Sequence, residues 1–377
     1  KYDNVECSAE NICYNQEDIL SAKKNCTQES IEAVKLAKNR IEAFHKHQLP
    51  EDSIYEDQEE VSIKTKWIPL DSAGIYIPGG TASYPSSVLM GVIPAQVAGI
   101  KKISATVPCP NNQIDPLVLA TLDLCGIEKI YKIGGAQAIA ALAWGTESVE
   151  SVDMIIGPGN KWVAEAKKQA LSNINIDMLA GPSEILILAD ENNRADWVAA
   201  DLLSQAEHDI SAQAILVTDS ESLLENVINE LVNQTENLER KDIVKKSIAE
   251  NGYGILVSNI KDAIEIINNI APEHLSILCK ENSQIENKIT NAGVIFSDEW
   301  TPESMGDYII GPSHILPTNG MAKRQSGLSV YNFLRRQSTI SSSKKTINTL
   351  GPSAMLLADC EGLDAHANSI KIRIKDS

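Results

Sequence analysis

The feature that most constrains the fold is an alternation of short β-rich runs with helical or small-residue segments along most of the chain. Amphipathic segments such as 220–233 and 261–269 separate runs that are rich in Val and Ile. Strands that alternate with helices in this way form parallel sheets whose faces are covered by the helices. The expected strands are Ile75–Ile77, Ile103–Val107, Ile127–Ile133, Val152–Ile156, Ile185–Ala189, Ala214–Thr218, Gly254–Val257 and Val294–Ser297.

These strands fall into two sets, one ending at Ala189 and one starting at Ala214. A chain of 377 residues is too long for one ordinary hydrophobic core, so each set is expected to form its own α/β unit. Residues 28–48 carry apolar side chains at helical spacing and predict a helix. From about Ser326 the strand rhythm stops, and a helical pattern starts at Pro352, which indicates a small C-terminal domain.

The overall charge limits the class of partner. The chain has 33 basic and 51 acidic residues, a formal net charge of −18, which argues against binding to nucleic acid or to an anionic membrane. No apolar run reaches the roughly 18 residues of a membrane span, and the polar start is unlike a secretory signal. The cysteines give no sign of a structural framework. There are seven of them without a C-x-x-C motif, which argues against a disulfide framework or a cysteine zinc site. We therefore expect a cytoplasmic protein that acts on a small molecule.

Glycine-rich turns stand where three expected strands meet helices, over 77–81, 133–137 and 156–160. Backbone N–H groups in such turns can approach an anionic ligand at a helix start. The last turn departs from the G-x-G-x-x-G pattern because Trp162 stands where the final glycine belongs. The turns are thus compatible with a bound nucleotide or with tight turns that bind nothing.

Several histidines stand beside carboxylates or amides where the helix and strand signals break. Gln205 and His208 are three residues apart and would share one face of a helical turn. Glu273 precedes His274, a residue type suited to proton transfer near neutral pH. Asp307, His314, Glu361 and His366 lie in similar breaks.

A Gln, two His and an Asp would form a mixed nitrogen and oxygen set suited to zinc. Spacing alone cannot assemble such a set, and each histidine taken singly also fits a surface or structural role. His45 and His47, two residues apart on a helix, would point in different directions and are both expected at the surface.

From about Trp67 to the end, the chain closely resembles the histidinol dehydrogenase family, whose members usually carry a further N-terminal helical segment. Several stretches that match in the same order are more specific than any single glycine motif. The matching stretches are 74–80, 134–143, 157–160, 180–184, 204–208, 271–275 and 311–318.

This resemblance implies an intertwined homodimer built from two Rossmann-like, incomplete doubly wound parallel-sheet domains and a small C-terminal tail domain. Residues 1–74 and 183–325 would form the first Rossmann-like domain, with the zinc and catalytic residues. Residues 75–182 would form the second, with the NAD contacts, and residues 326–377 would reach the partner subunit.

The resemblance also implies a four-electron oxidation of L-histidinol to L-histidine through L-histidinaldehyde, the last step of histidine biosynthesis, with two NAD and one zinc ion per subunit. His274 resembles the general base, and Glu273 the carboxylate that activates water. The zinc ligands would be Gln205, His208, Asp307 and, from the other subunit, His366, and these residues would also meet the substrate. Further substrate contacts would be Ser183, His274, His314 and Glu361, and NAD contacts would be Tyr76, Gln137 and Asn160.

Two alternatives remain open at this point. One is a related zinc- and NAD-dependent alcohol dehydrogenase that acts on another polar alcohol, such as a sulfonated diol. Ser183 and the stretch 326–330 resemble the histidinol enzymes more closely. The other is a non-catalytic zinc-binding dimer, which would bind zinc without reducing NAD.

Overall fold

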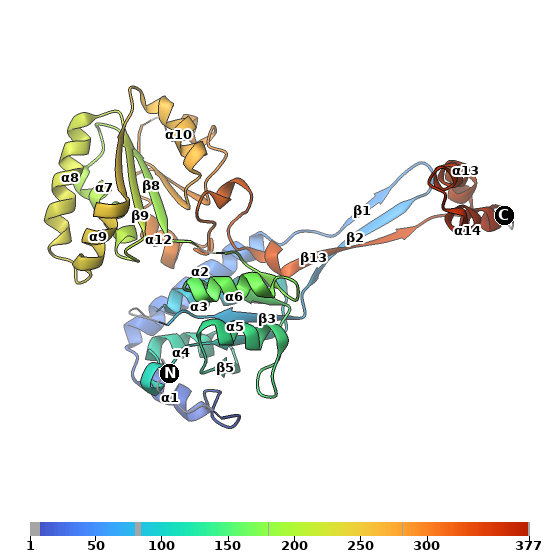
Figure 1. Ribbon diagram of the computed structural model, residues 1–377, viewed down its shortest axis with the longest axis horizontal. Coiled ribbons are helices and arrows are strands. Elements are labelled where there is room, and N and C mark those ends of the chain that lie inside the picture. The colour runs from blue at the N-terminus through green and yellow to red at the C-terminus, as the bar shows by residue number, and fades with distance from the viewer. Residues whose placement is uncertain (1–7, 80–83, 180, 281, 376–377) are drawn as a thin grey trace. The chain divides into compact units, whose positions relative to one another are not determined.

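The computed structural model describes residues 8–79, 84–179, 181–280 and 282–375. The chain divides into two compact units (Figure 1). The first unit comprises Lys1–Gln48 and Asp71–Phe333, and the second comprises Leu49–Leu70 and Leu334–Ser377.

The first unit contains two five-stranded parallel sheets with the same topology. One sheet has the order β5-β4-β3-β6-β7 and the other β10-β9-β8-β11-β12. In both, the order reverses beside the first strand in the chain, as in doubly wound α/β folds. The first sheet consists of β3 (Ser72–Tyr76), β4 (Lys102–Thr106), β5 (Lys129–Tyr131), β6 (Met154–Ile156) and β7 (Asn175–Ile176). The second consists of β8 (Glu184–Ala189), β9 (Gln213–Thr218), β10 (Gly252–Leu256), β11 (His274–Ile277) and β12 (Val294–Ser297). The expected parallel α/β architecture is therefore confirmed.

Helices pack on both faces of the second sheet because β8 is apolar on both sides. Ile185 and Ile187 face α7 and α8, while Leu186 and Leu188 face α10 and α11. Burying each such side chain stabilises the fold by about 1.5–3 kcal/mol. The helices of the first unit are α1 (Gln16–Lys24), α2 (Gln28–His47), α3 (Pro85–Ala98), α4 (Pro116–Leu124), α5 (Gly135–Trp144), α6 (Lys161–Ala170), α7 (Ala195–Ala206), α8 (Glu221–Thr235), α9 (Lys241–Asn251), α10 (Ala263–Ile270), α11 (Asn282–Glu286) and α12 (Glu303–Tyr308).

The N-terminal helices pack beside the first sheet. Helix α1 packs against α4, and α2 packs against α3 and α4. Arg40 in α2 also donates to the Ile309 carbonyl over 3.0 Å. Leu49–Leu70 belong to the second unit, where β2 (Ser62–Pro69) pairs with β13 (Leu334–Ser341). Amphipathic periodicity shows that α2 must bury one face but does not identify its partner.

The prediction that His45 is exposed is wrong, whereas His47 is exposed as expected. The two side chains do point in different directions, but His45 points inward, where its Nδ1 lies 2.7 Å from Gln48 Oε1. Its ring also packs edge-on against Phe44. Burial lowers the pKa of His45 from 6.5, while the hydrogen bond to Gln48 opposes the shift.

Replacing His45 with phenylalanine should make the stability of the fold less sensitive to acid. Below the ordinary pKa of 6.5, the unfolded chain binds a proton that folded His45 excludes, so the free energy of unfolding falls as the pH falls. One proton contributes at most about 1.4 kcal/mol per pH unit. Urea unfolding between about pH 7.5 and 5.5 measures this slope. His47→Phe is the matched control, and an unchanged slope in His45→Phe would contradict the assignment.

The second unit combines a long antiparallel ribbon with two helices (Figure 1). The ribbon has the order β1-β2-β13, with β1 at Ser53–Glu56, β2 at Ser62–Pro69 and β13 at Leu334–Ser341. The helices are α13 (Lys344–Cys360) and α14 (Asp364–Lys375), which pack against each other.

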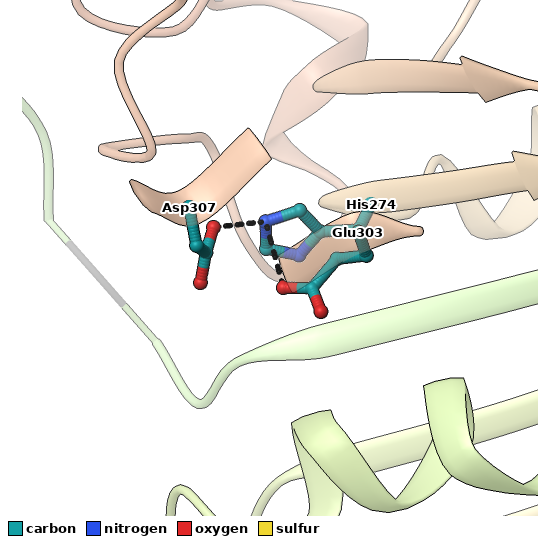
Figure 2. A group of neighbouring side chains, drawn as sticks. All are labelled: His274, Glu303 and Asp307. Atoms are coloured by element: carbon teal, nitrogen blue, oxygen red, sulfur yellow. Dashed lines mark ion pairs between the residues drawn. The ribbon is translucent and has the colours of Figure 1, made fainter. Parts of the chain in front are cut away.

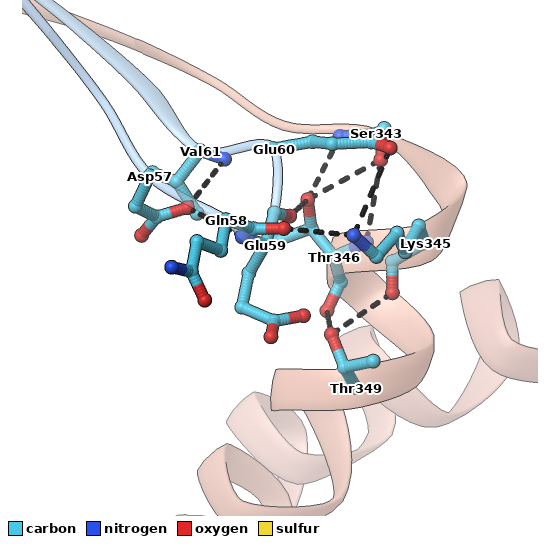
Figure 3. Close-up of polar contacts among 9 residues, drawn as sticks. All are labelled: Asp57, Gln58, Glu59, Glu60, Val61, Ser343, Lys345, Thr346 and Thr349. Carbon is cyan, nitrogen blue, oxygen red and sulfur yellow. Dashed lines mark hydrogen bonds and ion pairs between the residues drawn. The ribbon is translucent and has the colours of Figure 1, made fainter.

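The turn between β1 and β2 is hydrogen-bonded to the start of α13 (Figure 3). Thr346 Oγ1 donates to the Glu59 carbonyl over 2.5 Å, and Lys345 Nζ donates to the Gln58 carbonyl over 2.7 Å. Ser343 caps α13, since its side chain accepts from the Thr346 N–H. The strand rhythm therefore does not stop at Ser326, as the sequence suggested, and α13 starts before Pro352.

Among the residues that the structure describes, no helix has the length and apolar character needed to cross a bilayer. The cysteines at 13, 26, 109, 125, 279 and 360 are free thiols, as expected, and Cys7 lies outside the described residues.

Candidate active site

The candidate site is built where β8 and β11 begin, side by side in the second sheet. His274 opens β11 and stands opposite Ile185 in the register of the two strands. The backbone of Glu184 contacts both acid–base candidates, since its N–H donates to Glu273 Oε2 over 2.9 Å and its carbonyl lies 3.0 Å from His274 Nδ1. Glu273 and His274 are only 6% and 2% exposed. Strand pairing thus holds the two side chains in place.

The contact with Glu184 determines which nitrogen of His274 can accept a proton. A carbonyl oxygen only accepts hydrogen bonds, so Nδ1 carries the hydrogen and Nε2 is the basic nitrogen. Nε2 lies 3.6 Å from Asp307 Oδ1 and 3.9 Å from Glu303 Oε1 (Figure 2). Glu303 and Asp307 are four residues apart in α12, which places both on the face that meets His274.

Burial and the concentration of carboxylates shift the protonation of this cluster. Burial lowers the pKa of His274, but the neighbouring Glu273, Asp307 and Glu303 outweigh it and raise the pKa to about 10. Burial raises the pKa of Glu273 to about 8, and burial together with Asp307 raises that of Glu303 to about 7. Although burial opposes it, the close approach of His274 and the nearby His314 and His208 lower the pKa of Asp307. Asp307 is therefore ionised near neutral pH, whereas Glu273, His274 and Glu303 can hold protons there.

Gln205 and His208 come from the end of α7. Gln205 is 1% exposed, and its Oε1 has no hydrogen-bond partner among the described residues. His208 follows the helix, and its backbone N–H donates to the Gln205 carbonyl over 3.1 Å. Desolvation by the surrounding protein lowers the pKa of His208, and the charge of Asp307 only partly offsets this shift. His208 thus shares the electrostatic environment of Asp307.

His314 lies on the other side of Asp307. Its Nδ1 is 3.0 Å from the Asp307 carbonyl, and burial lowers its pKa while Asp307 opposes the shift. A cavity of about 120 Å³ opens beside these side chains, between β12 and the segment that follows α12. Its lining includes His274, Phe296, Gly306, Asp307, Ile310 and His314.

The turns singled out for NAD lie in the first sheet. Tyr76 ends β3, and its hydroxyl accepts from the Gly135 N–H over 3.1 Å at the start of α5. Gln137 is exposed in the first turn of α5, and Asn160 caps α6 by accepting from the Trp162 and Val163 N–H groups. Residues 80 and 81 of the first glycine turn lie outside the described residues.

The remaining predicted site residues are more scattered. Ser183 is half-buried just before β8, and its carbonyl accepts from the Gln213 N–H. Glu361 and His366 belong to the second unit, where both side chains are exposed.

Sequence reasoning did not identify Glu303 as a site residue. Its side chain is 2% exposed, Oε2 lies 3.0 Å from Ser204 Oγ, and Oε1 has no hydrogen-bond partner among the described residues. The available signal was its separation of four residues from Asp307, but a helix of only six residues has too weak a pattern to reveal it.

The cluster has the chemistry of a divalent-metal site. His274, Glu303 and Asp307 bring ligand atoms within 4.8 Å of one another. Buried nitrogen and oxygen atoms that lack hydrogen-bond partners, such as Gln205 Oε1 and His274 Nε2, are costly unless a ligand satisfies them. This nitrogen and oxygen donor set fits zinc.

The two doubly wound sheets and the buried histidine–carboxylate cluster define an α/β protein with a candidate metal site. The histidinol dehydrogenase family model matches residues 1–374. Among curated relatives, histidinol dehydrogenase from Gluconobacter oxydans is 43% identical over 100% of this chain and 87% of its own length. The Rhizobium meliloti enzyme of the same name is 46% identical over 99% of this chain and 86% of its own length.

Solved structures agree with this assignment. The crystal structure of histidinol dehydrogenase from Elizabethkingia anophelis has a TM-score of 0.96 and 39% identity, and the match covers 100% of this chain and 86% of that one. A propionaldehyde dehydrogenase from Rhodopseudomonas palustris, at 12% identity and a TM-score of 0.52 over 89% of this chain and 90% of its own, shares only the fold. The chain belongs to the histidinol dehydrogenase family, and it is an NAD- and zinc-dependent oxidoreductase.

Proposed function

We propose that this chain oxidises L-histidinol to L-histidine through L-histidinaldehyde, transferring four electrons to two NAD. The observation that carries the proposal is the convergence of His274 Nε2 on Asp307 at 3.6 Å, beside the buried Glu273. It gives one site a basic nitrogen and a carboxyl able to hold a proton near neutral pH. Both are needed to oxidise an alcohol and then a hydrated aldehyde.

Gln205, His208 and Asp307, together with His366 from a second copy of the chain, are proposed to hold one zinc ion per subunit. The unpartnered Gln205 Oε1 and the electrostatic proximity of His208 to Asp307 support the first three. Zinc supplies a redox-inert centre that binds nitrogen and oxygen donors, which suits the orientation of an amino alcohol. Ser183, His314 and Glu361 are proposed as further substrate contacts.

The proton transfers are assigned to His274 and Glu273. In the first oxidation the alcohol carbon loses hydride to NAD, and His274 Nε2 takes the hydroxyl proton, which leaves the aldehyde. In the second, Glu273 takes a proton from water as that water adds to the aldehyde. The resulting hydrate anion then loses hydride to a second NAD, which leaves the carboxylic acid. His274, having released its first proton to solvent, takes the proton of this acid. Burial raises the pKa of Glu273 to about 8, so the ionised carboxylate that accepts the proton is the predominant form only above that pH.

The first sheet is proposed to bind NAD through Tyr76, Gln137 and Asn160. Tyr76 stands at the carboxyl end of β3, beside the point where the strand order reverses, which is where doubly wound sheets bind their ligands. Gln137 and Asn160 stand at the starts of α5 and α6, where the positive end of the helix dipole favours phosphate.

A homodimer with shared active sites is proposed from the surface of the second unit. This unit exposes large apolar side chains that a single chain leaves in water. Leu356 and Leu357 are 64% and 66% exposed on α13, and Ile340 is 69% exposed on β13. A second copy of the chain would cover these side chains.

Zinc content measured together with histidinol-dependent NAD reduction tests the function. We expect about one zinc per subunit and two NAD reduced per histidinol, with activity lost on chelation and restored by added zinc. A sulfonated diol is the comparison substrate. Turnover of the diol alone would replace the histidinol assignment, and bound zinc without any NAD reduction would indicate a non-catalytic dimer.

A further inference from the structure

A buried ion pair lies beneath the turn between β6 and α6. Lys167, on α6, and Asp177, just after β7, have side chains only 4% and 1% exposed, and Lys167 Nζ lies 2.6 Å from Asp177 Oδ1. Lysine and aspartate are rarely buried so completely unless they are paired. The pair belongs to neither the histidine–carboxylate cluster nor the residues proposed to contact NAD.

Both charges also hold the backbone of Gly157, the residue that follows β6. Asp177 Oδ2 accepts from the Gly157 N–H over 2.8 Å, and Lys167 Nζ donates to the Gly157 carbonyl over 2.5 Å. The second carboxylate oxygen, Oδ1, accepts from the Met178 N–H over 2.7 Å as well. Two side chains therefore bind the donor and the acceptor of a single peptide residue.

The position of Gly157 admits no residue that carries a side chain. Its φ is +121°, which only glycine adopts readily, and a Cβ there would lie 1.9 Å from the Tyr76 carbonyl oxygen. The turn is therefore packed directly against the end of β3. Three residues later, Asn160 caps α6.

A buried ion pair is weak evidence for stability, because two charges must be removed from water and a well-packed apolar pair can often replace them. An apolar pair could not bind the N–H and the carbonyl of Gly157. The polar contacts of the pair therefore specify the position of the turn rather than only filling space.

We propose that Lys167 and Asp177 are positioning residues that hold the 157–160 turn in the conformation that receives NAD. This inference rests on the proposed NAD contacts at Tyr76 and Asn160. Without the pair, the turn would sample several conformations, and binding NAD would require selection of one of them. We expect the affinity for NAD to fall, and the zinc content and the KM for histidinol to stay unchanged.

The test uses the full-length protein with Lys167→Met and Asp177→Asn combined, which leaves no unpaired buried charge. NAD binding is measured by titration calorimetry, and KM for histidinol and zinc content are measured in parallel. We expect NAD to bind at least about tenfold more weakly, with histidinol KM and zinc content within about twofold of wild type. A purely structural pair would lower the melting temperature and leave the NAD affinity of the folded protein unchanged. That outcome would overturn the proposal.

Controls separate this inference from the proposed function. Lys23→Met breaks the more exposed ion pair with Asp123 and should not change NAD affinity. If the double variant fails to fold, Lys167→Arg, which keeps the charges paired and changes only the donor geometry, carries the test, with NAD binding at least about threefold weaker expected and unchanged binding overturning the proposal. If wild-type protein binds no NAD, the proposed function fails. If wild type binds NAD and the folded variants bind it equally well, only the role of the pair fails.

Discussion

Replacing His274 with asparagine should lower turnover of histidinol at least about a hundredfold while zinc stays bound. The asparagine amide cannot accept and return a proton, so the alcohol proton loses its acceptor. The His274 side chain is only 2% exposed, so bulk solvent does not stand ready to replace it as the base. His274 is proposed to transfer protons and is not among the proposed zinc ligands. The zinc content of the variant should therefore match that of wild type although its turnover falls.

The measurement pairs steady-state kinetics with the metal content of the purified variant. His47→Asn is the matched control, because His47 is an exposed histidine on α2. Near-normal turnover in His274→Asn would remove this residue from the mechanism. Loss of zinc together with activity would instead make His274 a ligand, as its position in the cluster with Glu303 and Asp307 also permits.

The parallel strands could be predicted from the sequence because their side chains are buried on both faces. All six residues of β8 are buried, which produces the continuous apolar run that indicates such a strand. The ribbon strand β13 has no such signal, since seven of its eight residues are exposed. The strand β11 has only four residues and follows Pro272 and Glu273, so its pattern is too short to recognise.

The start of α13 was hidden for a different reason. Ser343 and Thr346 form its capping box, whereas the usual sequence signal has Glu or Gln at the third helical position. The sequence predicts that the helical pattern starts at Pro352, but this residue lies inside the helix.

The site shows what residue types can and cannot specify. Glu273 beside His274 indicated acid–base chemistry from adjacency alone. His274 and Asp307 are 33 positions apart, and only the tertiary packing of α12 brings their side chains to 3.6 Å. The Gly157 turn was visible as a glycine motif, but Lys167 and Asp177 beneath it have no local pattern. Tertiary structure alone pairs them.

Replacing His366 or His208 with alanine should abolish most activity in each variant, and mixing the two variants should restore part of it. In the proposed dimer, each zinc site takes His208 from one subunit and His366 from the other. A mixed dimer therefore has one site that lacks both histidines and one site that keeps both. With random exchange of equal amounts, half the dimers are mixed and half their sites are intact, so about one quarter of wild-type activity should return.

A second mixture distinguishes sharing from general stabilisation by the partner. His208 and Asp307 are assigned to the same subunit, so His208→Ala mixed with Asp307→Asn leaves every site defective and should give no recovery. Differently tagged chains show by mass that mixed dimers have formed. If they form and the His208→Ala with His366→Ala mixture stays inactive, His366 does not reach across. If both mixtures recover equally, the gain comes from association rather than from a reassembled zinc site.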